Sequence, residues 1–368
     1  MPSVTEQDIL DILRPIEDPA RGESLVALGM IGGVQVREGH VTFTIEVDAA
    51  RAGEYEPVRK RCEDAAFGAP GVLSATAVLT AHSETPSAPG PARGAPTPAL
   101  GIPGVRAIVA VASGKGGVGK STAAVNIAVA LQQQGLAVGL MDADIYGPSL
   151  PRMMGLSGRP DSPDGKVILP KLAHGIPCMS IGFMVEDDTP MIWRGPMVMS
   201  AIEQLLRDVR WGDLDVLIVD MPPGTGDAQL TMAQRVPLTG AVIVSTPQDV
   251  ALSDVRKGLN MFRKVDVPVF GIVENMSYYL CPHCGERSEI FGHGGARQTA
   301  DALGTDFLGE IPLHVAIRET SDAGTPIVAS QPDSEHAQAF KAVASRLAEK
   351  IDESLAANAA AAPRIVVE

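Results

Sequence analysis

The spacing of apolar positions over residues 1–82 predicts a small α+β domain. Apolar residues recur at helical intervals and then alternate with polar residues, in the order helix, strand, strand, helix, strand (αββαβ). The expected elements are 5–16, 26–36, 40–47, 55–67 and 72–79. A segment rich in Pro, Ala and Gly covers 83–104, and we expect an extended linker because this segment has little apolar surface to bury.

From residue 105 onward, short apolar runs alternate with segments of helical period. This alternation predicts an α/β domain with a mainly parallel sheet flanked by helices. The expected strands are 107–112, 137–141, 215–219, 241–245 and 268–273. The expected helices are 121–134, 197–208, 227–235, 250–264, 295–303 and 335–354. We expect this domain to cover 105–355 and a disordered, Ala-rich tail to cover 356–368.

The composition is that of a globular protein with an aliphatic interior. Of 368 residues, 45% are hydrophobic and only 4% are aromatic. The net charge of −14 argues against general affinity for nucleic acid or anionic membranes, so neither is an expected partner. There is no apolar run long enough for a membrane span, and the start of the chain lacks the features of a secretory signal. With only four cysteines, we expect a cytoplasmic protein.

The strongest chemical signal is the run 114–122, Gly-Lys-Gly-Gly-Val-Gly-Lys-Ser-Thr, which satisfies the phosphate-loop pattern G-x-x-x-x-G-K-[ST]. It lies between a predicted strand and a predicted helix, and a helix N-terminus favours bound anions. Lys120 can reach the β- and γ-phosphates of a nucleotide, and the Ser121 hydroxyl can bind Mg²⁺. The expected nucleotide contacts are Gly114, Gly116, Gly117, Val118, Gly119, Lys120, Ser121 and Thr122. The pattern does not require Lys115.

Three carboxylates lie at or just after the ends of two predicted strands. Asp142 and Asp144 follow the apolar run 137–141, at the edge where open α/β sheets bind ligands. One could orient the attacking water and the other could bind Mg²⁺ or its waters, although strands also end in plain aspartate turns. Asp220 ends a second apolar run, as a Mg²⁺-binding aspartate does. The Pro-Pro-Gly turn behind it contains Gly224 and predicts a loop that responds to the γ-phosphate.

Cys281-Pro282-His283-Cys284 forms a second candidate site, since two thiols three positions apart can bind one metal centre. Zinc could take both cysteines together with His283 or His293. The pair could be a redox couple, or a solvated loop without a ligand. Two chains could also combine their pairs, so that four thiolates hold one iron–sulfur cluster on a dimer axis. The spacing alone leaves these four interpretations open.

Together these motifs resemble the Mrp/ApbC-type iron–sulfur cluster carrier ATPases, members of the MinD/ParA/nitrogenase-reductase class with a deviant phosphate loop. The resemblance covers about residues 103–350. The motifs that carry it are 115–120, 142–149, 193–197, 220–227, 274–277 and the Cys-Pro-x-Cys pair. It implies the P-loop NTPase fold and a homodimer. The unit at 1–82 resembles an iron–sulfur assembly domain that often precedes these carriers, but no cysteine follows its second strand, and Cys62 lies in a predicted helix.

The resemblance also implies a role for each motif residue. The residues implied to be catalytic are Lys115, which would reach the ATP of the other subunit, Lys120, and Asp144, which would position the water. Residues implied to bind the nucleotide and its Mg²⁺ are those of the loop, Asp142, Asp220, Gly224 through its amide, and Asn275 at the adenine. Ser121 would ligate Mg²⁺, and Cys281 and Cys284 would ligate a bridging [4Fe–4S] cluster.

The function expected from the resemblance is a cytoplasmic ATPase that hydrolyses ATP slowly and transfers a labile cluster to apo-proteins. A scaffold protein is a further candidate partner. The alternative is a MinD/ParA-like spatial regulator that acts on membrane or DNA and has the same loop. The acidic balance of the chain argues against this alternative, as does the mixed charge of the segment 336–356. An electron donor of the nitrogenase-reductase kind would take its cysteines from separate segments, unlike this adjacent pair.

Overall fold

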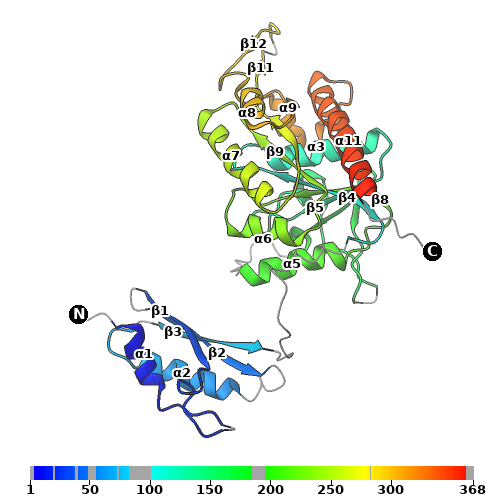
Figure 1. Ribbon diagram of the computed structural model, residues 1–368. Coiled ribbons are helices and arrows are strands. Elements are labelled where there is room, and N and C mark those ends of the chain that lie inside the picture. The colour runs from blue at the N-terminus through cyan, green and yellow to red at the C-terminus, as the bar shows by residue number, and fades with distance from the viewer. Residues whose placement is uncertain are drawn as a thin grey trace, which may run out of the picture. The chain divides into compact units, whose positions relative to one another are not determined.

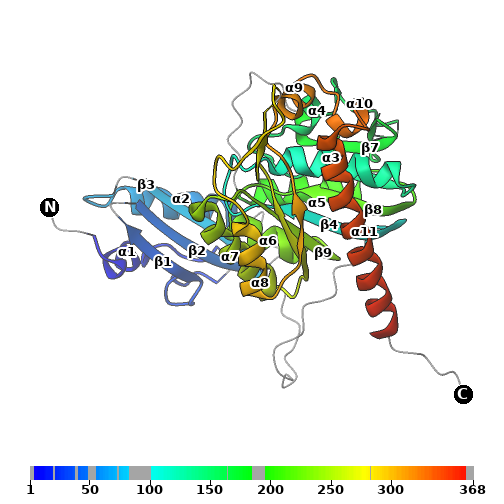
Figure 2. The same cartoon turned by 90° about the horizontal axis from the view of Figure 1, so that it is seen from above.

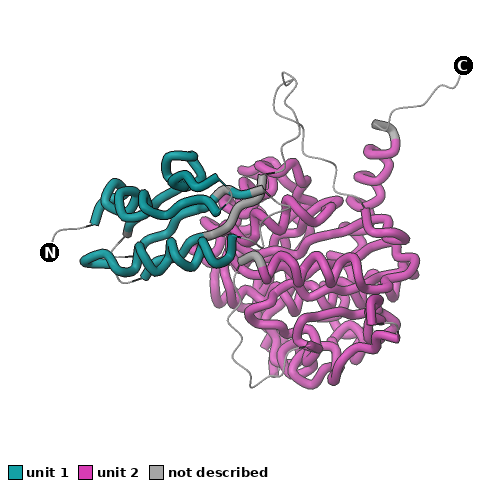
Figure 3. Tube along the Cα trace, turned by 90° about the horizontal axis from the view of Figure 1, so that it is seen from below, with its two compact units in different colours: residues 1–95 teal, residues 96–368 magenta. Residues whose placement is uncertain are grey.

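The chain forms two compact units, Met1–Ala95 and Pro96–Glu368, each with its own hydrophobic core (Figure 3). The computed structural model describes residues 4–19, 21–37, 40–48, 55–72, 74–82, 101–163, 165–184, 195–281 and 283–361. The boundary between the units falls within the expected linker. Residues 83–100 of that linker lie outside the described residues.

The first unit is a three-stranded sheet with two helices, in the expected order αββαβ. Its elements are α1 (Glu6–Leu13), β1 (Ile31–Arg37), β2 (His40–Asp48), α2 (Glu56–Phe67) and β3 (Ser74–His82). The sheet is mixed, because β2 pairs antiparallel with β1 and parallel with β3. Ile9 and Leu13 of α1 are fully buried in one cluster with Phe43 of β2. The first strand starts at Ile31 and not at 26, because the preceding turns end at Gly29, whose φ is +69°.

The second unit contains an eight-stranded sheet in the order β13-β10-β9-β4-β8-β5-β7-β6. The strands are β4 (Val105–Ala112), β5 (Val138–Asp142), β6 (Lys171–Ala173), β7 (Ile176–Ser180), β8 (Leu214–Asp220), β9 (Gly240–Ser245), β10 (Val269–Glu274) and β13 (Phe307–Glu310). The pairing is parallel except for β6, which runs antiparallel to β7. Strands β5 and β9 are buried throughout, which explains their continuous apolar sequence. The expected α/β class is confirmed.

Helices cover both faces of this sheet. They are α3 (Lys120–Gln133), α4 (Leu150–Met153), α5 (Gly195–Arg207), α6 (Asp227–Arg235), α7 (Asp249–Lys264), α8 (Gly295–Leu303), α9 (Val315–Asp322), α10 (Ile327–Ser330) and α11 (Glu335–Ala361), with a 3₁₀ turn at Ile181–Phe183. Helices α3 and α11 pack together on one side, whereas α5, α6 and α7 lie on the other (Figures 1 and 2). Within the described residues, no helix has the length and apolar character needed to cross a membrane.

Some elements differ from those expected. The short strands β6, β7 and β13 and the helices α4, α9 and α10 had no clear periodic signal. Helix α11 continues to Ala361, so the expectation of a disordered tail is wrong for 356–361. Alanine is the strongest helix former, which allows these residues to extend a helix already anchored in the core. Residues 362–368 lie outside the described residues.

The sheet order brings three chain segments to one crevice. From β4 the chain crosses toward β5 on one side and later reaches β9 on the other, so β4 lies at the point where the strand order reverses. Asp142, the last residue of β5, pairs in register with Asp220, the last residue of β8. The loop after β4 therefore lies beside both carboxylates.

Candidate functional site

The phosphate loop joins β4 to α3, and its glycines are required by its backbone. Gly117 and Gly119 have φ of +81° and +80°, which side chains rarely tolerate. A Cβ at Gly119 would also collide with the side-chain amide of Asn275. No side chain of the described residues caps α3, so the N–H groups of its first turn are available to an anion.

Lys120 is almost fully buried, with 6% of its side chain exposed. Its Nζ lies 2.5 Å from Oδ1 of Asp220, 3.3 Å from Oγ of Ser121 and 4.0 Å from Oδ2 of Asp144. The lysine is thus surrounded by the side chains that the sequence assigned to Mg²⁺ and to the attacking water. A phosphate bound here would compete with Asp220 for the lysine.

Asp142 holds the loop that carries Asp144. Its Oδ1 accepts from the N–H of Asp144 at 3.0 Å, and its Oδ2 accepts from the N–H groups of Ser149 and Leu150 and from the Ser180 hydroxyl at 3.1–3.2 Å. Its side chain is fully buried. Burial, and then the charge of Asp220, raises the pKa of Asp142. The described hydrogen bonds of Asp142 are therefore with this loop, the start of α4 and the end of β7, and its predicted role at the nucleotide would be indirect.

Asp144 is the more accessible carboxylate. Its side chain is 15% exposed and faces Lys120. Burial raises its pKa, and the charge of Lys120 acts in the opposite direction. The carboxylate can therefore receive a proton more readily than an aspartate on the surface.

The loop after β8 is held against the phosphate loop. The N–H of Gly224 donates to the carbonyl of Ser113 at 2.9 Å, and the side-chain amide of Gln229 donates to the carbonyl of Pro223 at 2.7 Å. Gly224 has φ of +104°, which favours glycine. For the Gly224 amide to reach a γ-phosphate, as expected from the sequence, this loop would exchange its bond to Ser113.

Asn275 links the end of β10 to the phosphate loop. Its side-chain amide donates to the carbonyl of Val118 at 2.8 Å, and its backbone N–H donates to Ser245 at 2.8 Å. Beside it opens a cavity of about 400 Å³, lined among others by Thr122, Asn275, Met276, Pro312, Ile317 and Arg318. The cavity is large enough for a nucleobase and begins at the first turn of α3.

The sequence motifs did not reveal the far wall of this cavity. Ile317 and Arg318 belong to α9, a helix that was not expected, and they lie almost 200 positions after the phosphate loop. The one available signal was the apolar spacing of 315–317 after Pro312, which is too short to distinguish a helix from a loop.

The cysteine pair lies in the turn of a hairpin formed by β11 (Tyr279–Leu280) and β12 (Arg287–Ser288). Cys284 is exposed and Cys281 is half-buried. The backbone N–H groups of His283 and Cys284 lower the pKa of Cys281, and the thiolate is the form that binds metals. Pro282 lies outside the described residues.

The other two cysteines are buried. Burial raises the pKa of Cys62 to about 11 and that of Cys178 to about 12, so both remain protonated thiols at neutral pH. Cys62 faces the core of the first unit from α2. Neither side chain is suited to metal binding as it stands.

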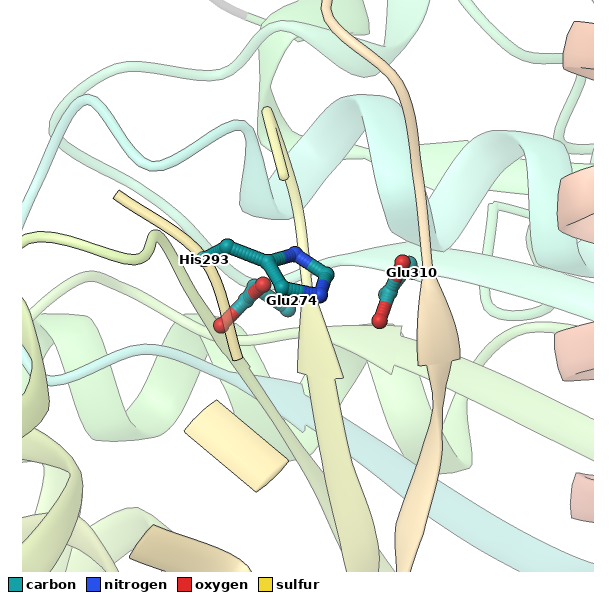
Figure 4. A group of neighbouring side chains, drawn as sticks. All are labelled: Glu274, His293 and Glu310. Carbon is teal, nitrogen blue, oxygen red and sulfur yellow. The ribbon is translucent and has the colours of Figure 1, made fainter. Parts of the chain in front are cut away.

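A third polar group lies next to the cysteine hairpin. Ligand atoms of Glu274, His293 and Glu310 lie within 4.8 Å of one another, and Glu274 and Glu310 end the neighbouring strands β10 and β13 (Figure 4). Such a group could hold a cation. The guanidinium of Arg287 already lies 3.3 Å from Glu310 and 3.2 Å from His293, so a positively charged side chain stands where a cation would bind.

The fold thus assembles most of the predicted nucleotide residues in one place. The loop 114–122, Asp144, Asp220, Gly224 and Asn275 surround the carboxyl ends of β4, β8 and β10, with Asp142 behind them. Cys281 and Cys284 lie together in a separate hairpin. Of the motif 193–197, residues 193 and 194 lie outside the described residues, and the remainder begins α5.

The sequence of the chain is similar to those of known iron–sulfur cluster carrier and transfer proteins. An iron-sulfur cluster carrier protein of Synechocystis is 48% identical over 354 residues, which cover 95% of this chain and 98% of the relative. The iron-sulfur cluster transfer protein NUBPL of Dictyostelium discoideum is 56% identical over 255 residues, which cover 69% of this chain and 79% of the relative.

Solved structures include a nucleotide-binding protein of Archaeoglobus fulgidus in complex with ADP. It is 40% identical, with a TM-score of 0.56 over 64% of this chain and 92% of that chain. The MinD protein of Pyrococcus horikoshii, complexed with Mg-ADP, matches with a TM-score of 0.50 over 67% of this chain and 98% of that one. Its 21% identity indicates a shared fold only.

Two family models match the chain, and together they confirm the resemblance seen in the motifs. Residues 6–77 match the model described as iron-sulfur cluster assembly protein. Residues 104–348, more than half of the chain, match the model described as NUBPL iron-transfer P-loop NTPase. The chain therefore belongs to the family of NUBPL iron-transfer P-loop NTPases.

Proposed function

We propose that the protein is an ATP-hydrolysing carrier of a [4Fe–4S] cluster, which two subunits hold between them and transfer to apo-proteins. The observation that carries the proposal is the accessible pair Cys281 and Cys284, six positions after Asn275 of the nucleotide site. The names of the relatives, cluster carrier and cluster transfer proteins, support the same function. A cluster held by accessible thiolates needs a reducing compartment, so we propose a cytoplasmic location.

The cysteine pair supplies half of a cluster site. A [4Fe–4S] cluster is held by four thiolates, and Cys62 and Cys178 are buried thiols that cannot provide the other two. A second copy of the hairpin would provide them. Backbone donors around Cys281 favour the thiolate that such a site requires.

In the nucleotide cycle, Lys120 and Ser121 would hold the β- and γ-phosphates and Mg²⁺. The phosphate would replace Asp220 as the partner of Lys120, and the released carboxylate could then organise the Mg²⁺ shell. Asp144 would position the attacking water, and Asn275 together with the adjoining cavity would receive the adenine. The purpose of slow hydrolysis would be to switch the loop that contains Gly224.

Homodimerisation would complete the nucleotide site as well. Lys115 is half-buried, and within the described residues no carboxylate pairs with it, so it could serve the phosphate of the second subunit as an arginine finger does. Tyr146 in the loop after β5 is 64% exposed, and Met197 at the start of α5 is 45% exposed. Exposed apolar side chains next to a nucleotide-dependent loop are suited to a subunit interface that forms and separates.

Anaerobic cluster reconstitution tests the carrier function. We expect the wild type to bind iron and sulfide at one cluster per two chains, and Cys281→Ala and Cys284→Ala to lose both, because each removes two of the four thiolates of the dimer. Iron, sulfide and zinc content, together with the visible absorbance of the cluster, are the measurements. Cys178→Ala, which changes a buried thiol, is the control and should retain the cluster.

Other results would contradict the bridging cluster. Equal iron and sulfide in wild type and in Cys281→Ala would exclude these cysteines as ligands. Stoichiometric zinc without sulfide in the anaerobic wild type would favour the zinc interpretation.

A further inference from the structure

The hairpin that carries Cys281 and Cys284 is short. Strands β11 and β12 are two residues long each. Within the turn, the N–H of Cys281 donates to Glu286 at 3.0 Å and the N–H of Gly285 donates to Cys281 at 2.8 Å. A hairpin of this size is at best marginal in water. The position of the two thiols therefore depends on contacts outside the hairpin.

Arg287, the first residue of β12, makes three such contacts. Its guanidinium lies 3.9 Å from the centroid of the Tyr278 ring. It also donates to the Glu310 carboxylate at 3.3 Å and lies 3.2 Å from Nδ1 of His293. One side chain thus connects the hairpin to the segment before it, to the end of β13 and to the segment before α8.

Two carboxylates lie close together at this end of the sheet. Glu274 and Glu310 are register partners on neighbouring parallel strands, and their carboxylates point into the same group (Figure 4). Glu274 is fully buried and accepts bonds from the Ser277 hydroxyl at 2.6 Å and the Ala296 N–H at 2.7 Å. Like charges so close repel each other, and the guanidinium of Arg287, 3.3 Å from Glu310, brings a positive charge to this end of the sheet. A metal ion in this group would have to displace the guanidinium.

The end of β10 also connects this group to the candidate nucleotide site. Glu274 is followed directly by Asn275, which donates to Val118 in the phosphate loop. The segment from Asn275 to Cys281 is short and is bonded along its length, since the N–H of Ser277 donates to Ile311 at 2.9 Å. The carbonyl of Tyr278 accepts from Leu313 at 2.7 Å. A displacement of Asn275 would therefore be transmitted to the hairpin, because the segment between them is short and held by backbone hydrogen bonds.

We propose that Arg287 is the positioning residue that anchors the cysteine hairpin to the ends of β10 and β13, so that the nucleotide state at Asn275 alters the geometry of Cys281 and Cys284. The inference rests on the proposed role of these cysteines in holding the cluster. It adds the residue through which the phosphate loop and the thiols are coupled, and it requires no metal in the Glu274–His293–Glu310 group.

Amide hydrogen exchange on the full-length, metal-free protein tests this role. Arg287→Gln removes the charge and the stacking, and we expect the amides of Cys281 and Gly285 to exchange roughly ten-fold faster. Arg287→Lys keeps the charge and should restore most of the protection. With Mg²⁺ and a non-hydrolysable ATP analogue, exchange in the hairpin should change in the wild type and in Arg287→Lys, but not in Arg287→Gln, although all three bind the analogue equally.

Arg297→Gln is the matched control, because Arg297 stacks on Phe307 at 4.3 Å without a described contact to the hairpin. It should leave hairpin exchange unchanged. Hairpin exchange in Arg287→Gln equal to that of the wild type would overturn the anchoring role. A wild-type hairpin that does not respond to the analogue would overturn the coupling. Because the protein is metal-free, failure of the cluster function would appear separately, in the reconstitution experiment.

Discussion

At the scale of single residues, Lys120 is the clearest sign of a site prepared for an anion. Its charge is buried and is balanced by Asp220 at 2.5 Å. Burying two charges costs desolvation energy that their attraction only partly returns, so such a pair is weak evidence for stability. A ligand phosphate that takes the place of Asp220 gives the arrangement a functional reason. Lys115 differs, because it has no described carboxylate partner within its own subunit.

Lys115→Ala should retain ATP binding and lose turnover, since we propose that its ammonium group reaches the phosphate bound by a second subunit. By analogy with arginine fingers, we expect kcat to fall by roughly 10³-fold. Nucleotide titration and a steady-state phosphate-release assay measure the two effects. Lys264→Ala, at an exposed position of α7, is the control. Unchanged turnover in Lys115→Ala would show that this lysine is not catalytic.

Gly119→Ala should destabilise the fold more than Gly117→Ala. Both glycines have φ near +80°, but only at Gly119 would a Cβ collide with Asn275, whereas Gly117 has no atom within 4 Å of that position. We expect backbone strain of roughly 1–3 kcal/mol in each variant, and a further loss at Gly119. The free energy of unfolding in urea measures these losses of stability. Adding Asn275→Ala to Gly119→Ala should remove the collision and so recover the additional loss of stability seen at Gly119. Equal destabilisation of the two glycine variants would contradict this explanation.

At the scale of elements, the loop from β5 to α4 is held as a unit by Asp142. Two backbone N–H groups of the loop and that of Leu150 at the start of α4 donate to this one buried carboxylate, and the bond from Asp144 fixes the backbone that carries its side chain. The loop continues into α4, whose end approaches that of α9. Gly155 and Gly324 both have positive φ there, and a Cβ at Gly324 would meet Gly155 at 2.5 Å. The loop is thus packed against α9, which lines the cavity beside Asn275.

The pH dependence of ATP turnover should reflect Asp144. Because burial raises its pKa, the carboxylate is protonated at a higher pH than an ordinary aspartate. If the ionised form positions the water, kcat/KM should fall as pH decreases, with the acidic limb above the ordinary aspartate range near 3.8. A pH–rate profile measures this.

Asp144→Asn should lower turnover at every pH and abolish that limb. Asp333→Asn, at an exposed position before α11, should leave the profile as in the wild type. An acidic limb that persists in Asp144→Asn would assign the titration to another group.

At the scale of the whole molecule, the chain consists of two units with separate cores. The buried residues of the first unit, among them Phe43 and Cys62, form one cluster, and those of the second unit form another. A unit with its own core can fold alone. All residues assigned to the nucleotide and the cysteine site belong to the second unit.

A protein truncated to residues 96–368 should therefore fold and bind nucleotide with the affinity of the full chain. Circular dichroism during heating and nucleotide titration check both properties. The full chain under the same conditions is the control. Aggregation of the truncated protein, or loss of nucleotide binding, would show that the second unit depends on the first.

Several features could be read from local sequence because each is built from consecutive residues. The phosphate loop is one, and strands β4, β5, β8, β9 and β10 are others, since burial of most of their residues makes each a largely apolar run. β7 was missed because Ile176–Ser180 is short and contains Pro177. Helix α9 was missed because its eight residues carry little periodic signal.

The motifs alone indicated a nucleotide site and a pair of thiols, since neighbouring residues create both. The contacts between distant segments came only with the tertiary structure. Asn275 bonds to Val118 across 157 positions, and Lys120 bonds to Asp220 across 100. Strand order and crossovers bring these residues together, and both depend on burying the whole sheet rather than on any local pattern. For the same reason, the contact of Arg287 with Glu310, which ties the thiols to the strand ends, has no signature in the sequence.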